Sequence, residues 1–262
     1  LIEIISAPFG CKETEIISIK GKKDQLNYMW RRDASQWANS APILFPIVGA
    51  LKNDTCVING KEYHMTQHGF ARHNEFETNQ VSDTEVIFSL KSNDEIIKQY
   101  PFLFELNVTY KLVENKLKCH IEVKNTDHQP IYFQVGGHPA FACPFMENES
   151  SNDYYLEFSE NETCNRKIID VEKRGMSRVE KPFFDNEKRF FVRQELFNTD
   201  AIVIKNFKSE NIALKSLNHD KSIVFHMNGF DHVGLWAAKH VGGLIAIEPW
   251  VGHADYTDFN GE

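Results

Sequence analysis

Short runs of alternating or wholly apolar residues recur along almost the whole chain, and they constrain its fold more than any other feature. Examples are TEIISIK, EVIFSL, FELNVTYKLV, KLKCHIEVKN, YYLEF, NIALKSL and GLIAIEPW. A period of two residues is typical of β-strands, because successive side chains point to opposite faces of a sheet. Many such runs without helical periodicity predict an all-β fold, an antiparallel sandwich or barrel rather than a fold of alternating strands and helices.

Two local patterns refine this prediction. In FELNVTYKLVENKLKCHIEV, two alternating runs flank Glu114 and Asn115, which predicts a β-hairpin. Only NDEIIKQYPF has a helical pattern, and Pro101 is expected to end that helix. Because there is no low-complexity linker and no repeat of fixed period, residues 1–262 are expected to form a single domain.

The composition argues against several classes of protein. The net charge of −8 and the lack of a basic block argue against a nucleic-acid partner. No apolar run approaches the roughly 18 residues of a membrane helix, and the start LIEIISAPFG lacks the pattern of a signal peptide. The cysteines are widely spaced and include no C-x-x-C pair. We therefore expect a reduced, cytoplasmic protein without a membrane partner, either a monomer or a homodimer.

Two histidines lie in similar glycine-containing runs, each at what looks like the end of a strand. TQHGFARHNEF contains His68, and FQVGGHPAF contains His138. The glycines indicate tight turns or the close approach of another group to the backbone. Zinc is one alternative, because His64 and His68 would face one way on a helix. However, that run starts like a strand and lacks the glutamate of H-E-x-x-H.

A non-covalent acid–base site is the chemistry that the residues favour. No serine or cysteine has the local motif of a nucleophile, and VGGL and VGGH are too short to bind phosphate. Glu248 in AIEPW follows the apolar run GLIAI and is expected where a buried strand ends, so burial would raise its pKa. A solvated or ion-paired Glu248 and a core His138 bound to backbone groups remain the structural alternatives.

Five segments occur in an order that is specific to one family. They are MWRRDASQWANSAPILFPIVGALKND, HMTQHGFAR, VGGHPAF, NTDAIVIKN and AIEPWVGHAD, and together they extend over nearly the whole chain. This order resembles the aldose 1-epimerase (galactose mutarotase) family, most closely its bacterial LacX-like branch. The resemblance implies a large antiparallel β-supersandwich. It also implies an isomerase of hexose metabolism that interconverts the α and β anomers of a free sugar such as galactose or glucose, without cofactor or metal.

The same resemblance implies roles for individual residues. Glu248 resembles the general base that takes the proton of the C1 hydroxyl, and His138 resembles the general acid that protonates the ring oxygen. His68 resembles the second histidine, which hydrogen-bonds the sugar. Asp200 of NTDAIVIKN resembles the acid that binds sugar hydroxyls, and Arg72 is an expected polar neighbour in substrate binding.

Two departures from the family pattern affect what the resemblance implies. Galactose mutarotases proper carry an arginine after a glycine upstream of the first histidine, where this chain has Ala50. Either Arg72, Arg31 or Arg32 compensates, or the substrate differs. The chain also stops at YTDFNGE, where relatives continue into further strands, so the C-terminal strands of the domain are expected to be missing.

Three alternatives to the epimerase of free hexoses stay open. A hexose-6-phosphate 1-epimerase would need arginine or lysine for the phosphate, which MWRRD and Arg72 could supply. A non-catalytic sugar-binding or sensing protein is kept open by Ala50. A metal-dependent β-sandwich enzyme would use His64 and His68. Three aromatic residues are candidates to stack on a sugar or, equally, to pack in the core: Trp37, Phe45 and Trp250.

Overall fold

The computed structural model describes residues 2–6, 14–238 and 243–261. The strands are β1 (Ile2–Ser6), β2 (Ile16–Gly21), β3 (Ile43–Leu44), β4 (Thr55–Ile58), β5 (Lys61–His64), β6 (Glu77–Ser82), β7 (Glu85–Lys91), β8 (Phe104–Val113), β9 (Lys116–Asn125), β10 (Val135–Gly137), β11 (Ala140–Cys143), β12 (Tyr154–Asp170), β13 (Gly175–Phe191), β14 (Ile202–Lys205), β15 (Asn211–Ser216), β16 (Ser222–His226), β17 (His232–Trp236) and β18 (Gly243–Val251). The helices are short: α1 (Asp94–Ile97) and the 3-10 turns η1 (Lys52–Asp54), η2 (Ala71–His73), η3 (Ser151–Asp153) and η4 (Gln194–Phe197). The predicted all-β class is confirmed.

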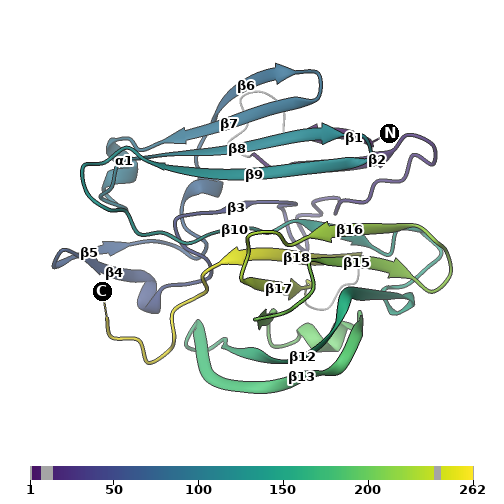
Figure 1. The fold of residues 1–262 in the computed structure, drawn as a ribbon. Coiled ribbons are helices and arrows are strands. Elements are labelled where there is room, and N and C mark those ends of the chain that lie inside the picture. The colour runs from purple at the N-terminus through teal and green to yellow at the C-terminus, as the bar shows by residue number, and fades with distance from the viewer. Residues whose placement is uncertain (1, 7–13, 239–242, 262) are drawn as a thin grey trace.

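The largest sheet among the described residues contains ten strands. Eight of them follow the order β16-β15-β12-β14-β17-β18-β10-β3, while β11 also pairs with β18 and β13 pairs with β12. β12 is 17 residues long, so it pairs with β15 near its start and with β14 near its end. Figure 1 shows β12 and β13 as a long curved hairpin below the rest of this sheet.

A second sheet contains β6, β7, β8 and β9 in sequence order and lies above the large sheet in Figure 1. In its central hairpin Val113 pairs with Lys116, so Glu114 and Asn115 form a two-residue turn. Glu114 has φ 57°, the left-handed conformation that such tight hairpin turns require. The predicted hairpin is therefore confirmed, and so is the short helix α1, which ends before Pro101.

The main core joins the two sheets. Phe88 and Leu106 of the four-stranded sheet belong to the same cluster of buried side chains as Leu235, Ile245 and Ile247 of the large sheet. Successive side chains of a strand point to opposite faces, so the residues of β18 that alternate with Ile245 and Ile247 point to the other face of the sheet. Glu248 is one of these alternating residues, so the candidate carboxylate faces away from this core. No helix in the described ranges is long and apolar enough to span a membrane.

Candidate active site

A cavity of about 330 Å³ lies on the face of β18 that points away from the main core. Its walls come from distant parts of the chain: Trp37, Gly49, Ala50, Gln67, His68, Arg72, His138, Ile169, Val171, Arg174, Gly175, Met176, Asp200, Ala201, Trp236, Glu248, Trp250 and Ala254. All five site residues predicted from the sequence line this one cavity. A second, more open hollow of about 500 Å³ lies along β13 and includes none of them.

The sheet register brings the two candidate acid–base residues together. β10 pairs with β18 with Gly136 opposite Trp250, and after Pro139 β11 pairs with β18 in the same register. That register places His138 opposite Glu248, and directly opposite residues project on the same face of an antiparallel pair. His138 Nε2 lies 3.3 Å from Glu248 Oε1. Glu248 lies inside β18, which continues to Val251, so its expected place at the end of the strand is corrected.

Burial shifts the acidity of both groups toward their neutral forms. The side chains of His138 and Glu248 are only 10% and 2% exposed. Burial raises the pKa of Glu248 well above its ordinary value, and the nearby Asp200 carboxylate acts in the same direction. Burial also lowers the pKa of His138 to about 3, with a smaller contribution of the same sign from Arg72. Glu248 Oε2 and His138 Nδ1 are buried without a hydrogen-bond partner among the described residues.

His68 is fixed by a reciprocal pair of hydrogen bonds with Gly49. The His68 N–H donates to the Gly49 carbonyl at 2.8 Å, and the Gly49 N–H donates to His68 Nδ1 at 3.1 Å. Burial lowers the pKa of His68 well below its ordinary value, so the imidazole is neutral. Because Nδ1 accepts, Nε2 carries the hydrogen and can donate. His68 lies in a turn beyond β5, which ends at His64, and not at a strand end as the sequence suggested.

The glycine after His68 allows a close backbone approach. Gly69 has φ 70°, and a Cβ there would lie 2.3 Å from the carbonyl oxygen of Phe45. That oxygen accepts from the N–H groups of Phe70 and Ala71, both at 3.1 Å. The prediction of a close approach at this glycine is confirmed. Phe45 itself is fully buried in the main core and does not line the cavity, so it is not a sugar-stacking residue.

Asp200 adds a second carboxylate to the cavity. Its φ is 95°, and one carboxylate oxygen accepts from the N–H of Ala201 at 2.7 Å, which fixes the direction of the side chain. Burial raises the pKa of Asp200.

Of the arginines proposed to compensate for Ala50, only one reaches the cavity. Arg72 lines it, and its Nη2 donates to the carbonyl of Gln67 at 3.0 Å, while its buried Nε has no partner among the described residues. Arg31 and Arg32 do not line the cavity, and Arg32 Nε donates to a loop carbonyl at 2.8 Å. This corrects the expectation for those two residues.

Three further polar or aromatic residues of the cavity were missed from the sequence. Gln67 adjoins His68, and its amide Nε2 lies 3.4 Å from His68 Nε2, so its place beside a quoted histidine was the available signal. Trp236 lies in an apolar run that reads as core. Arg174 ends the β12–β13 turn and pairs with Asp54 at 2.6 Å, and nothing in its local sequence indicated the site.

Trp250 forms a flat wall of the cavity because glycines lie on both sides of it. A Cβ on Gly136 would lie 2.8 Å from indole Cδ1, and a Cβ on Gly234 would lie 2.7 Å from indole Cζ2. The indole therefore extends across three neighbouring strands, directly beside Glu248. Trp250 also packs in a buried cluster with Leu44 and Met176, so it is part of the core as well as of the cavity wall.

The two histidines proposed as metal ligands, His64 and His68, do not line the same cavity. His64 has a side chain that is 73% exposed, lies 3.4 Å from Glu62, and does not line the cavity that contains His68. Within residues 2–6, 14–238 and 243–261, no group of three or more His, Cys, Asp and Glu side chains could hold a metal ion.

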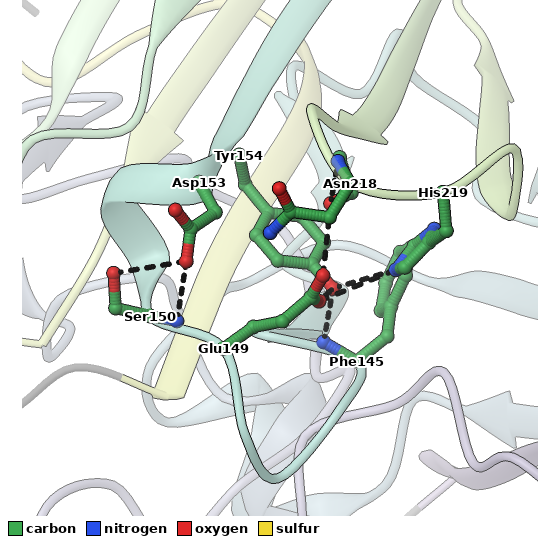
Figure 2. A network of polar contacts seen from close by, with 8 residues as sticks. Phe145, Glu149, Ser150, Asp153, Tyr154, Asn218 and His219 are labelled. Atoms are coloured by element: carbon green, nitrogen blue, oxygen red, sulfur yellow. Dashed lines mark hydrogen bonds and ion pairs between the residues drawn. The ribbon is translucent and has the colours of Figure 1, made fainter.

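A second buried polar cluster lies outside the cavity (Figure 2). The Glu149 carboxylate accepts from the Tyr154 hydroxyl and lies 3.3 Å from His219 Nε2. The same hydroxyl accepts from the Phe145 N–H at 2.9 Å. These contacts connect the segment after β11 to the turn between β15 and β16, which is a structural role.

The fold and the site define a class of protein. It is an antiparallel β-sandwich with a buried histidine–glutamate pair in a cavity that fits a small molecule. The family follows from comparison with known sequences. The model of the aldose 1-epimerase family matches residues 12–262, and the chain belongs to that family.

Similar proteins agree with this assignment. The chain is 35% identical to Protein LacX, plasmid, and 34% identical to Protein LacX, chromosomal, both from Lactococcus lactis subsp. lactis, over 95% of this chain and 86% of each relative. A galactose mutarotase related enzyme from Lactobacillus acidophilus has a TM-score of 0.92 and 30% identity over 100% of this chain and 86% of that one. A galactose mutarotase-like protein from Lactobacillus casei ATCC 334 has a TM-score of 0.87 and 27% identity, covering 99% and 91%. The predicted resemblance and the mutarotase-like fold are confirmed.

Proposed function

We propose that this protein is a cofactor-independent aldose 1-epimerase that interconverts the α and β anomers of a free hexose such as galactose or glucose. The observation that supports it most is the 3.3 Å contact between His138 Nε2 and Glu248 Oε1 inside a buried cavity. Opening a sugar ring requires that one oxygen lose a proton while another gains one. A histidine and a glutamate in contact supply both functions in one place.

The two proton transfers balance within the pair. Glu248 takes the proton of the C1 hydroxyl while His138 donates a proton to the ring oxygen. The bond from C1 to the ring oxygen breaks, and the open-chain aldehyde forms. Rotation about C1–C2 presents the other face of the carbonyl, and closure reverses both transfers. Since the hydroxyl and ring oxygens are bonded to the same carbon, an acid and a base that touch each other can reach both.

The electrostatics of the site favour one proton in total on the pair. In the free protein burial places that proton on Glu248, so the reacting form, with ionised Glu248 and protonated His138, arises when the proton passes across the 3.3 Å contact. The pair must carry one proton in total, so that one group donates as the other accepts. Binding of a second proton is disfavoured because burial lowers the pKa of His138 to about 3. Loss of the only proton is disfavoured because burial raises the pKa of Glu248. The acid side of the activity profile should therefore lie below the ordinary histidine pKa of 6.5.

Other cavity residues would bind and orient the sugar. His68 presents its Nε2 hydrogen to a sugar oxygen and stabilises negative charge that develops there. Asp200 accepts hydrogen bonds from sugar hydroxyls, and Arg72 Nε, which has no partner in the described part of the chain, donates one. Trp250 offers a flat apolar surface to the C–H groups of the ring.

The charges that line the cavity favour a neutral sugar over a sugar phosphate. Two arginines line the cavity, but Arg174 is already paired with Asp54 at 2.6 Å, and Arg72 shares the cavity with the Asp200 carboxyl group. A phosphate group would bring about −1.5 to −2 charges into a cavity that already holds the Asp200 carboxyl group. A free hexose brings none, and its hydroxyls match the donors and acceptors present.

Anomer exchange of fresh α-glucose and α-galactose, measured by polarimetry or by NMR, tests the proposal. We expect acceleration over the spontaneous rate, with kcat/KM at least about tenfold higher for a free hexose than for its 6-phosphate, a difference of about 1.4 kcal/mol. Faster turnover of the 6-phosphate would favour the phosphate alternative. Calorimetric binding of a hexose without acceleration would favour a non-catalytic sugar-binding protein.

A further inference from the structure

No described residue gives the imidazole of His138 the hydrogen bond that usually orients a catalytic histidine. In such sites the second ring nitrogen commonly bonds to a carbonyl or a carboxylate, which fixes the ring and its tautomer. Here Nδ1 is buried and has no partner among the described residues, while Nε2 faces Glu248. Other groups must therefore hold the ring in place.

Two indoles enclose this imidazole. The Trp37 ring lies 4.7 Å from the His138 ring at 31°, so it covers one face, and the Trp236 ring lies 5.5 Å away at 77°, edge to face. The two indoles also contact each other, with centroids 5.6 Å apart at 65°. Aromatic contacts of this kind are favourable beyond the area they bury. Together they restrict rotation of the imidazole.

We infer that Trp37 is a positioning residue, whose indole holds the His138 imidazole against Glu248 in the geometry required for proton transfer. The inference rests on the proposed epimerase function of this site. It gives Trp37 a role different from stacking on the sugar. A wrongly rotated imidazole would still leave the cavity able to bind sugar, but its Nε2 would point away from the ring oxygen.

Trp37 is itself held firmly enough to act in this way. The backbone N–H of Trp37 donates to the carbonyl of Asp33 at 2.8 Å. The backbone carbonyl of Trp37 accepts from the indole Nε1 of Trp30 at 2.8 Å. Trp30 packs in a small buried cluster with Ala246 of β18. The loop that carries Trp37 is therefore attached to the strand that carries Glu248.

The indole face also suits the acid role of His138. The face of an aromatic ring carries a negative quadrupole, which attracts a cation placed above it. A stacked indole therefore stabilises the imidazolium more than the neutral imidazole. Removing Trp37 would remove both this effect and the restriction on rotation.

The test compares Trp37→Leu with Trp37→Phe, which keeps an aromatic face. We expect Trp37→Leu to lower kcat for hexose anomerisation about 10-fold with KM within about 2-fold, since small misplacements of a catalytic group cost rate rather than binding. Trp37→Phe should retain most of the activity. The ¹H–¹⁵N signals of the His138 ring, assigned by their loss in His138→Asn, should broaden or shift in Trp37→Leu only. Tyr132→Leu, at an aromatic side chain exposed on the surface, is the matched control and should change neither readout.

Each outcome decides a separate point. A rise in KM at unchanged kcat would mean that Trp37 stacks on the sugar, and unchanged His138 signals in Trp37→Leu would also overturn the inference. The unmodified protein could fail to accelerate anomerisation while Trp37→Leu still alters the His138 signals. In that case Trp37 does position the imidazole, and the proposed function is wrong. Thermal unfolding of each variant checks that the fold is kept.

Discussion

At the scale of single residues, the candidate chemistry depends on removing His138 and Glu248 from water. A surface glutamate would be ionised at neutral pH and a surface histidine would titrate near neutrality, so the pair would lose its single shared proton easily. Inside the cavity both charged forms are disfavoured, with the side chains 10% and 2% exposed. The pair therefore keeps one proton, on Glu248, as the pH rises above the ordinary range of a carboxyl group.

Glu248→Gln is the sharpest test at this scale. The amide keeps the shape and one hydrogen bond of the carboxylate but cannot accept the proton of the C1 hydroxyl. We expect kcat to fall by about 10²-fold or more while the affinity for the sugar changes only a few-fold, as for an interaction made in the transition state. Steady-state anomerisation kinetics and calorimetric sugar binding measure the two quantities. Wild-type turnover in this variant would contradict the mechanism even though the family assignment would stand.

A double variant tests whether the two residues act in the same step. His138→Asn alone should also lower kcat by about 10²-fold. Because the two transfers occur together, the variant with both changes should be impaired less than the product of the single losses. Fully multiplicative losses would indicate independent roles.

At the scale of elements, three neighbouring strands build the wall beside Glu248. β18 carries Trp250, and β10 and β17 place Gly136 and Gly234 on either side, so the indole can lie flat across the sheet. Any side chain at either glycine would occupy the space of the indole. The glycines thus serve the packing of a neighbour and not a turn.

Gly234→Ala should displace the Trp250 indole, since the added Cβ would lie 2.7 Å from its Cζ2 atom. We expect a loss of about 1–3 kcal/mol in unfolding free energy, as for an overpacked core, together with a several-fold rise in KM. Urea unfolding and anomerisation kinetics measure these effects. The control is Gly60→Ala: Gly60 has φ 76°, and no atom of the described residues lies within 4 Å of a Cβ added there. It should cost about 1–2 kcal/mol of backbone strain and leave KM unchanged. An equal effect of both variants on KM would contradict this account.

At the scale of the whole molecule, the buried titratable groups make stability depend on pH in two opposing ways. The pKa of His138 is about 3 in the folded state, below its ordinary 6.5, so the unfolded chain binds the proton more readily. Stability is therefore lost as pH falls below about 6.5, at up to about 1.4 kcal/mol per pH unit for each such group. The raised pKa of Glu248 acts in the opposite sense, because its contribution is present below pH 4.5 and is lost as pH rises above it.

His138→Asn should therefore flatten the acid side of the stability curve. Between pH 7 and pH 5 the difference in unfolding free energy between the unmodified protein and this variant should shift by about 1–2 kcal/mol in favour of the variant. Glu248→Gln should instead flatten the loss of stability on the alkaline side. Urea unfolding at several pH values measures both curves. Parallel curves for all three proteins would show that neither group is buried in the state described.

The sequence by itself determined the all-β class, the β8–β9 hairpin, the short helix α1 and the five predicted residues that meet in the cavity. These features are local, because alternation follows from the geometry of a strand and turns follow from the conformations that a few residues allow. The ordered segments around His68, His138, Asp200 and Glu248 added the family. Each segment is a short local motif, so it can be recognised without knowledge of the tertiary structure.

Only the tertiary structure decided how those segments meet. The register of β10 and β11 on β18 sets the 3.3 Å contact between residues 110 positions apart, and a shift by one residue would turn the two side chains to opposite faces. Packing likewise placed Phe45 in the core, kept Arg31 and Arg32 outside the cavity, and set Trp37 against His138. Register and packing depend on side chains far apart in the sequence, so no single segment could specify them.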